Sequence, residues 1–286
     1  MAENTEVMAS QPSLPDSKDV IRIMESVAAR EIVPRFRHLA GHDIAEKNPG
    51  DLVTIADIEA ERALARELPP LVPGSVVVGE EGAEEDPSVL EALAGERPVW
   101  LVDPIDGTHN FAHGKPCFAV IIALCQDGEL RAGWIHDPLS DLTAWAMAGG
   151  GAWIRENDAV RRLGAVTPAP MTEMEGSLGT SLRKRLTAKR DAGDAEVPAL
   201  MVRYRCVGQE YLDLARGRLH FARYGGRLKP WDHAAGVLIH REAGGFGALI
   251  EGRAPYNPRP GIIQGSLLLA PDANAWDALH RVMNGV

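Results

Sequence analysis

Cysteine is scarce in this chain of 286 residues, which contains three. Cys117, Cys125 and Cys206 are an odd number, and no two of them form a Cys-x-x-Cys pair. The first two lie in an apolar run, where a thiol usually behaves as a small buried hydrophobic group. The pattern argues against a disulfide framework and indicates a reducing, cytoplasmic location.

Long apolar runs and an excess of positive charge are also missing. The longest apolar run, residues 117–125, is well short of the about 20 residues of a membrane-spanning helix, and the N-terminus lacks the features of a secretory signal. Lys and Arg number 30 against 40 Asp and Glu, a formal net charge of −10, whereas nucleic-acid-binding proteins generally carry a positive excess. We expect neither a membrane nor a nucleic-acid partner.

What is present is the composition of an ordinary globular protein, with 45% hydrophobic and 24% charged residues. Residues 1–16 are polar and contain Pro12 and Pro15, which predicts a disordered tail. Residues 17–165 are interpreted as an N-terminal α+β half with consecutive strands. Residues 166–286, where strands and helices alternate, are interpreted as a C-terminal α/β half. The predicted fold class is therefore α/β, with layers of helix and sheet.

Apolar periodicity and turn residues predict the individual elements. Helices are expected from Asp16 towards Pro34, over residues 54–68, around 182–191, at 207–216, at 232–243 and from Asp272. Strands are expected at residues 75–79, 98–102, 117–125, 129–136, 142–148, 177–181, 200–204, 219–222 and 262–270. Between residues 160 and 172 the periodicity is interrupted, which marks the junction of the two halves.

The stretch Asp-Pro-Ile-Asp-Gly-Thr follows directly on a predicted buried strand. Its carboxylates, Asp103 and Asp106, lie where open α/β sheets bind ligands. Gly107 lets the chain approach a ligand closely, and Thr108 stands where a helix could begin, with free N–H groups that favour an anion such as phosphate. The alternative is a plain Asp-Gly turn followed by a Thr N-cap.

Three further carboxylates stand at predicted element ends. Glu80 follows a strand, Asp232 precedes a helix, and Asp57 comes three residues after Thr54. Singly they are explained as a solvated loop, a helix cap and half of a capping box. Together they suggest a site for Mg²⁺, which carboxylate oxygens hold while water and phosphate take the remaining positions. Two such ions activate an attacking water and neutralise the leaving oxygen.

With these residues and their spacing, the chain resembles the inositol monophosphatase family of Mg²⁺-dependent phosphatases. The order of the predicted helices and strands matches that family over residues 18–284. The motifs are Gly-Glu-Glu at 79–81, Asp-Pro-Ile-Asp-Gly-Thr-x-Asn-Phe at 103–111, Trp-Asp-x-Ala-Ala-Gly at 231–236, and Asp-Leu-Val-Thr-x-x-Asp at 51–57 preceded by Lys47. The resemblance implies an α-β-α-β-α sandwich of the inositol monophosphatase and fructose-1,6-bisphosphatase type. It also implies a homodimer and sensitivity to lithium.

The resemblance further implies roles for individual residues and two or three Mg²⁺ ions per subunit. Glu80, Asp103 and the Ile105 carbonyl would hold the first ion, Asp103, Asp106 and Asp232 the second, and Glu80 would also contact a third. The amides of Gly107 and Thr108 would hold the phosphate. Thr108, paired with Asp57, would orient or deprotonate the attacking water. By this assignment, the N-terminal half carries most of the metal ligands.

Two positions depart from the family pattern. His109 stands where the family commonly has Thr, and Gly225 stands six residues before Trp231, where inositol phosphatases have a Glu that contacts sugar hydroxyls. Glu210 is a candidate for that contact, although it also reads as an ordinary helix residue. These departures leave the substrate open.

The segment from Arg203 to Lys229 is basic, with seven Arg and Lys residues against Glu210 and Asp213. A solvated or dimer-facing surface is one explanation. The other is that Arg223, Arg227 or both face the pocket and favour a substrate with additional negative charge.

Other candidate sites are weaker. His109 and His113 are four residues apart but have no third zinc ligand at suitable spacing, and the glycines at 149–151 lack the Lys-Ser/Thr of a nucleotide-binding loop. The predicted function is hydrolysis of a small inositol monophosphate-like phosphomonoester, with Mg²⁺ as cofactor. The alternatives are the same chemistry on histidinol phosphate, a nucleotide 3′-phosphate or a sugar bisphosphate, and a non-catalytic binding or regulatory protein on this fold.

Overall fold

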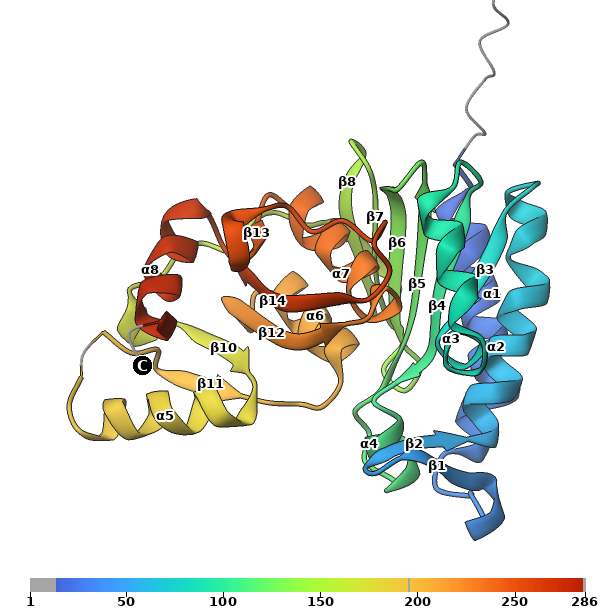
Figure 1. Cartoon of the computed structure of the whole chain (residues 1–286), viewed down its shortest axis with the longest axis horizontal. Helices are drawn as coiled ribbons and strands as arrows, with labels where there is room; N and C mark the ends of the chain where they lie inside the picture. Colours follow the sequence, from blue (N-terminus) through green and yellow to red (C-terminus); the bar gives the residue numbers. More distant parts are fainter. Residues whose placement is uncertain (1–13, 195, 285–286) are drawn as a thin grey trace, which may run out of the picture.

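Five layers, alternately helical and β-sheet, make up the structure (Figure 1). This computed structural model describes residues 14–194 and 196–284, so most of the predicted tail, residues 1–16, lies outside the described residues. The layers are an outer helix pair, a seven-stranded sheet, a central helix pair, a five-stranded sheet and a second outer helix pair. The predicted α-β-α-β-α sandwich is thereby confirmed.

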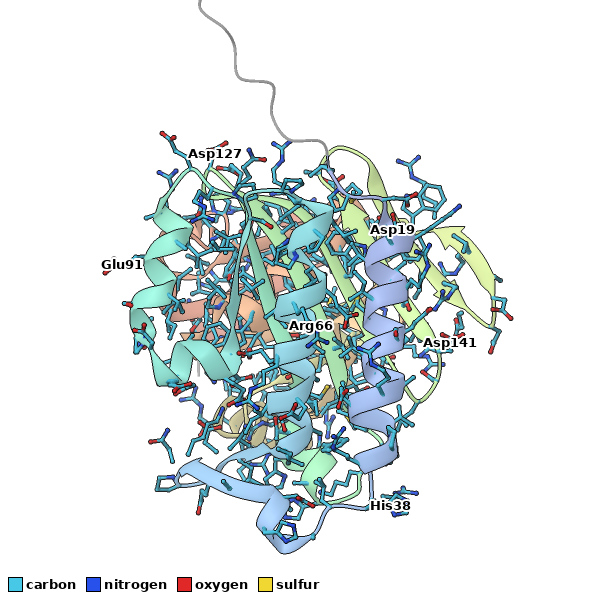
Figure 2. The ribbon with its side chains drawn as sticks, turned by 90° about the vertical axis from the view of Figure 1, so that its right-hand side faces the viewer. Asp19, His38, Arg66, Glu91, Asp127 and Asp141 are labelled. Atoms are coloured by element: carbon cyan, nitrogen blue, oxygen red, sulfur yellow. The ribbon has the colours of Figure 1, made fainter. Side chains whose placement is uncertain are left out.

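The first outer layer covers one face of the larger sheet, where α1 and α2 lie side by side (Figure 2). The helix that α1 begins continues to Ile32 with π geometry and ends at a 3-10 turn that contains Pro34, as the proline predicts. The bounds in this layer are α1 Ser17–Val27 and α2 Ile55–Glu67. A short hairpin, which the sequence did not predict, precedes α2; its strands are β1 Ile44–Asn48 and β2 Asp51–Thr54.

The seven-stranded sheet has the order β3-β4-β5-β6-β7-β8-β9, in which β3 and β4 are parallel and every other pair is antiparallel. Its strands are β3 Val76–Gly79, β4 Val99–Asp106, β5 Ala119–Gln126, β6 Glu129–Asp137, β7 Leu142–Met147, β8 Gly151–Glu156 and β9 Ala159–Arg162. Every residue of β4 is buried, because helices cover both faces of the sheet. The predicted run of consecutive antiparallel strands is confirmed, whereas β8 and β9 were not predicted.

The five-stranded sheet is mixed, with the order β11-β10-β12-β14-β13. Its strands are β10 Glu175–Leu178, β11 Leu200–Val202, β12 Phe221–Leu228, β13 Phe246–Leu249 and β14 Ile263–Ala270, and the outer helices beside it are α5 Thr180–Asp191 and α8 Ala273–Asn284. The prediction of strand over 177–181 was wrong at its end, because α5 begins at Thr180. The prediction over 219–222 was too short, because β12 continues to Leu228.

The central layer consists of α6 Val207–Ala215 and α7 Pro230–Glu242. Helix α7 is buried over nearly its whole length, since it packs between the two sheets. Gly133 on β6 permits this packing, because a Cβ there would lie 2.7 Å from the Cα of Ala235 in α7. The first turn of α7 is thereby fixed beside the end of β4.

Candidate active site

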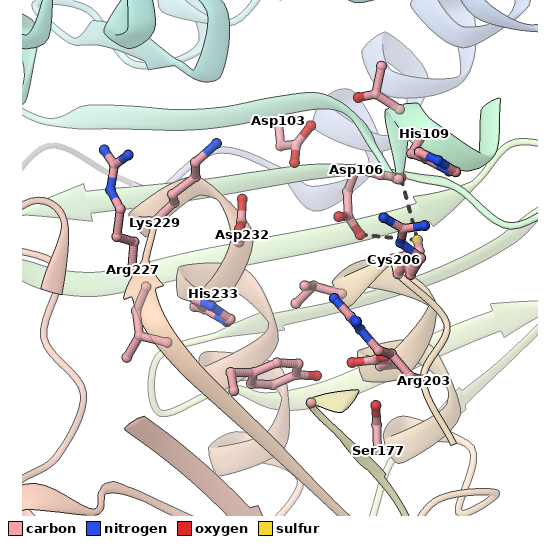
Figure 3. Close-up of a pocket in the computed structure, with 18 of the residues that line it drawn as sticks. Asp103, Asp106, His109, Ser177, Arg203, Cys206, Arg227, Lys229, Asp232 and His233 are labelled. Atoms are coloured by element: carbon pink, nitrogen blue, oxygen red, sulfur yellow. Dashed lines mark hydrogen bonds between the residues drawn. The ribbon is translucent and has the colours of Figure 1, made fainter. Parts of the chain in front are cut away.

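Acidic side chains from four elements meet where the parallel strands β3 and β4 end. Glu80 opens α3 (Glu80–Glu85), Asp103 and Asp106 lie near the end of β4, and Asp232 lies in the first turn of α7. Asp57 lies in the first turn of α2. Figure 3 shows Asp103, Asp106 and Asp232 around a common space. This is the site at strand ends that the sequence predicted.

The pairing of β4 with β5 is irregular between Asp103 and Asp106, and this irregularity brings both carboxylates to one side of the strand. Asp103 pairs with Ile121 and Asp106 with Ala119 on β5, so β4 has one more residue than β5 between these pairs. In a regular strand, side chains three positions apart point to opposite faces. The additional residue lets both carboxylates line one cavity. Pro104, which has no N–H to donate, stands within the irregular segment.

Three of the acids form a cluster with the spacing of metal ligands. Carboxylate oxygens of Glu80, Asp103 and Asp232 lie within 4.8 Å of one another. In the described part of the chain, no other group of three His, Cys, Asp or Glu side chains has this spacing. His109 and His113 stack with their ring centroids 4.3 Å apart but have no third ligand among the described residues.

Asp106 stands beside this cluster and is anchored to the central layer. One of its oxygens accepts hydrogen bonds from the backbone N–H of Gly208 at the start of α6 and from the thiol of Cys206, at 3.1 Å. The structure thus brings all four predicted acidic ligands into one cavity.

Burial and mutual repulsion raise the pKa values of Asp103, Asp106 and Asp232. Burial is the larger cause at Asp103 and Asp232, whose pKa values lie well above the ordinary range, and the Glu80 carboxylate raises both further. At Asp106, burial raises the pKa to about 6 against the opposing effect of the Gly208 N–H. A bound cation favours the charged forms. A buried, mutually repelling set of oxygen donors therefore fits a hard divalent ion such as Mg²⁺.

Two lysines contact the acidic cluster. Lys229 Nζ lies 2.7 Å from Glu80 Oε1, and Lys47 Nζ lies 3.0 Å from Glu81 Oε1 and 3.8 Å from Glu80 Oε1. Burial lowers the pKa of Lys229, but the carboxylates of Glu80 and Asp232 outweigh it and raise that pKa. Lys229 had no predicted role, although its place three residues before Asp232 was an available signal.

Thr108 and Asp57 lie in contact at the edge of the cluster. Thr108 Oγ1 lies 3.0 Å from Asp57 Oδ1 and 2.9 Å from the carbonyl oxygen of Ile105. The other oxygen of Asp57 accepts the backbone N–H of Thr54 at 2.8 Å, in the capping box that begins α2. Burial raises the pKa of Asp57 to about 7. The two interpretations of Asp57, helix cap and partner of Thr108, are both realised geometrically.

Gly107 forms the turn between β4 and the short helix α4 (Thr108–Ala112), and its φ of 91° lies in the left-handed region. A Cβ at this position would also lie 3.0 Å from the Cys117 carbonyl oxygen and 3.1 Å from Cys206 Cβ. Gly107, Thr108 and His109 line the cavity, which places the predicted phosphate-binding amides beside the acids.

The cavity continues away from the acids into a basic region. It has a volume of about 460 Å³. Four arginines line it, namely Arg203, Arg205, Arg223 and Arg227. The sequence left two explanations of the basic segment open, a solvated or dimer-facing surface and a pocket lined by Arg223, Arg227 or both. The placement of these arginines agrees with the second.

Glu210 is a buried acid that lines the same cavity. Its Oε1 accepts the backbone N–H of Tyr204 at 3.1 Å, and burial raises its pKa to about 7. Glu210 is thus a helix residue, as one alternative had it, and its side chain lies on the buried face of α6 at the pocket.

Comparisons with known proteins identify the relatives of this chain. The family model described as "Inositol monophosphatase family" matches residues 18–282. The chain is 32% identical to the inositol-1-monophosphatase of Bacillus subtilis over 72% of this chain and 76% of that protein. It is 33% identical to the fructose-1,6-bisphosphatase/inositol-1-monophosphatase of Thermotoga maritima over 73% of this chain and 76% of that protein. None of the described helices is long and apolar enough to cross a membrane.

Solved structures show the same architecture. The Thermotoga maritima IMPase superposes with a TM-score of 0.75 at 25% identity, covering 93% of this chain and 95% of that one. The extragenic suppressor protein SuhB of Bartonella henselae superposes with a TM-score of 0.71 at 26% identity, covering 92% of this chain and 98% of that one. On the family match, the sequence relatives and the shared fold, the chain belongs to the inositol monophosphatase family of phosphoric monoester hydrolases.

Proposed function

We propose that this protein hydrolyses a small polyol phosphomonoester, of the inositol monophosphate type, with Mg²⁺ as cofactor. The observation that carries the proposal is the cluster of Glu80, Asp103 and Asp232 oxygens beside the paired Thr108 and Asp57. Relatives named inositol-1-monophosphatase support the reaction class.

The proposed ligand sets follow the cavity. Glu80, Asp103 and the Ile105 carbonyl hold one ion, Asp103, Asp106 and Asp232 hold the second, and Glu80 contributes to a third, so that two or three ions serve each subunit. When bound, the ions neutralise phosphoryl oxygens and lower the pKa of water. The raised pKa values of Asp103 and Asp232 support this assignment, because cations relieve the repulsion that raises them.

The chain's own groups then position the reactants. The amides of Gly107 and Thr108 hold the phosphate at the N-terminal end of α4. The Thr108 hydroxyl donates its proton to Asp57, so its oxygen is left as an acceptor for a proton of the attacking water. Phosphoryl transfer depends chiefly on such positioning and on charge neutralisation, which suits a pocket whose reactive groups are carboxylates and one hydroxyl.

We also propose that the protein acts as a homodimer in the cytoplasm. The family resemblance supports the dimer. Three free cysteines, Cys117, Cys125 and Cys206, support a reducing compartment. Sedimentation of the purified protein measures the oligomeric state directly.

The proposed function is tested by phosphate release from a panel of phosphomonoesters, with and without Mg²⁺ and lithium. Glu80→Gln, Asp103→Asn and Asp232→Asn are each expected to lower kcat at least about a hundredfold, because each removes a charged ligand from ions worth several kcal/mol of transition-state stabilisation. Glu85→Gln is the matched control, since Glu85 is exposed on the same short helix as Glu80.

The control variant should retain wild-type turnover. Near-normal, Mg²⁺-dependent turnover in any two of the three ligand variants would contradict the metal assignment. A wild-type protein that releases no phosphate from any ester would favour the non-catalytic alternative.

A further inference from the structure

Resting on the proposed function, we propose that Arg223 and Arg203 form a second anion-binding subsite in the cavity, so that the preferred substrate is a polyol phosphate bearing a further carboxylate or phosphate group. The phosphate to be hydrolysed lies at the acidic cluster, and the second anionic group lies at the basic region of the same cavity.

The pairing of basic side chains within residues 203–229 points to this subsite. Three of the seven have carboxylate partners: Arg216 with Glu156, Arg218 with Asp213, and Lys229 with Glu80. The remaining four are Arg203, Arg205, Arg223 and Arg227, and none of them forms an ion pair with any residue in the described ranges. All four line the cavity, and no carboxylate of the described residues forms an ion pair with them; Glu251 acts on Arg223 only from a longer distance.

The topology brings Arg203 and Arg223 to the two sides of the C-terminal end of β10 in the smaller sheet. Strands β11, β10 and β12 are parallel neighbours. Arg223 pairs with Leu178 on β10, and Arg203 follows Val202, which pairs with Ser177 one position earlier. The two arginines therefore flank the end of β10, two strand spacings or about 10 Å apart, and their long side chains can reach one ligand between them.

Arg223 is held in place but is not neutralised. Its Nη2 donates to Ser266 Oγ at 3.0 Å, and its buried Nε has no hydrogen-bond partner among the described residues. Arg203 donates to the hydroxyl of Thr180, the first residue of α5. A half-buried guanidinium with no carboxylate in direct contact is costly, and an anion that accepts its free N–H groups lowers that cost.

Gly225 keeps Arg223 accessible from the cavity. An ideal Cβ on Gly225 would lie 3.5 Å from Arg223 Nη1 and 3.3 Å from Ser266 Oγ. A glutamate at this position, as the family pattern has, would therefore place its carboxylate against the Arg223 guanidinium and neutralise it. The absence of that glutamate is the sequence difference that leaves the second subsite positively charged. Figure 3 shows Arg203 reaching towards the cavity from the side of β10 and β11.

The test uses three six-carbon 6-phosphates that differ only at C1: glucitol 6-phosphate, gluconate 6-phosphate and glucitol 1,6-bisphosphate. At fixed free Mg²⁺, the wild type is expected to have roughly tenfold higher kcat/KM on the two with a charged C1, through lower KM, since one charge-assisted hydrogen bond is worth about a factor of ten. Arg223→Gln and Gly225→Glu are each expected to reduce that ratio roughly tenfold.

Arg185→Gln is the matched control. Arg185 is exposed on α5 and close enough to lower the pKa of Arg223, yet it does not line the cavity. It should leave the substrate ratio unchanged. Equal wild-type kcat/KM on all three esters, or an equal loss on all three in Arg223→Gln, would overturn the inference while the proposed function stands. If no ester is hydrolysed, the proposed function fails, and calorimetric binding of gluconate 6-phosphate decides the inference: equal affinity in wild type and Arg223→Gln overturns it.

Discussion

The Thr108 hydroxyl has one proton and two acceptors within reach, the Ile105 carbonyl and Asp57 Oδ1. In the proposed mechanism Asp57 is the acceptor, because a deprotonated carboxylate accepts a hydrogen bond more strongly than a neutral carbonyl does. The oxygen of Thr108 then keeps a lone pair for the water. The burial that raises the pKa of Asp57 to about 7 also makes a carboxylate there a strong acceptor, because it has little competing solvation.

Thr108→Val should therefore lower kcat by about 10²- to 10⁴-fold, the usual contribution of a positioned proton acceptor. Valine preserves the shape of threonine but has no hydroxyl. Thr108→Ser, which retains the hydroxyl, is the control and should keep most of the activity. Mg²⁺ affinity, measured by calorimetry, should change little in either variant. Valine and serine variants of equal kcat would rule out this role for the hydroxyl.

Asp57 also shows what a sequence can predict at the residue scale. Its spacing from Thr54 predicts a capping box, and the family motif implies a partner of Thr108. One oxygen serves each contact. Ion pairs such as Lys229 with Glu80 were not predictable in the same way, because the two residues come from different layers and only the fold sets their distance.

At the scale of elements, prediction succeeded where a segment is apolar as well as buried. Helix α7 and the apolar first half of β4 were located from the sequence, whereas the predicted strand ended at residue 102 and missed the buried residues Asp103 to Asp106. Strand β9 is fully exposed and has no alternating pattern, so it was missed. Residues 223–228 of β12 were missed because this segment, Arg-Tyr-Gly-Gly-Arg-Leu, lines the pocket except at Gly226 and has no alternating apolar pattern. The part of β12 that lines the pocket thus has a weak hydrophobic signal.

Gly133→Ala tests how helix packing positions Asp232. The new methyl group would lie 2.7 Å from the Cα of Ala235, so α7 must move away from β6. We expect a loss of about 1–3 kcal/mol in the free energy of unfolding and a weaker Mg²⁺ affinity, because Asp232 moves relative to Asp103. Gly164→Ala is the control, since its Cβ meets no atom within 4 Å. Unchanged Mg²⁺ affinity in a destabilised Gly133→Ala protein would contradict the positioning argument.

At the scale of the whole molecule, the acidic site joins parts of the chain that are far apart in sequence. Asp57, Glu80 and Asp103 come from the proposed N-terminal half, residues 17–165, and Asp232 comes from the proposed C-terminal half, residues 166–286. Without cations, their buried carboxyl groups repel one another. The buried acids therefore lower the free energy of unfolding of the metal-free protein while they form a binding site, as is common where function requires destabilising groups. Bound ions should hold the two halves together.

The stabilisation by Mg²⁺ should therefore depend on pH. Carboxyl groups with pKa values of about 6 at Asp106 and about 7 at Asp57 retain protons in the folded state that the unfolded chain loses near pH 4. The free energy of unfolding of the metal-free protein thus falls as the pH rises from about 4 through about 7. Mg²⁺ binds the deprotonated acids, so its stabilising effect grows over the same range.

The measured quantity is the difference in Tm between protein with Mg²⁺ and protein with a chelator, at about pH 5 and about pH 8. Buried histidines such as His233, whose pKa burial lowers to about 3, change stability with the opposite sign, but they contribute equally to both samples and cancel. An ion concentration a hundredfold above Kd adds about 2.7 kcal/mol to the free energy of unfolding. We therefore expect a Tm difference of several degrees at about pH 8 and a much smaller difference at about pH 5. Asp103→Asn should abolish most of the difference, because it removes a ligand and a repelling charge together. A difference that is equal at the two pH values, or larger at the lower one, would mean that the buried acids do not bind the ion.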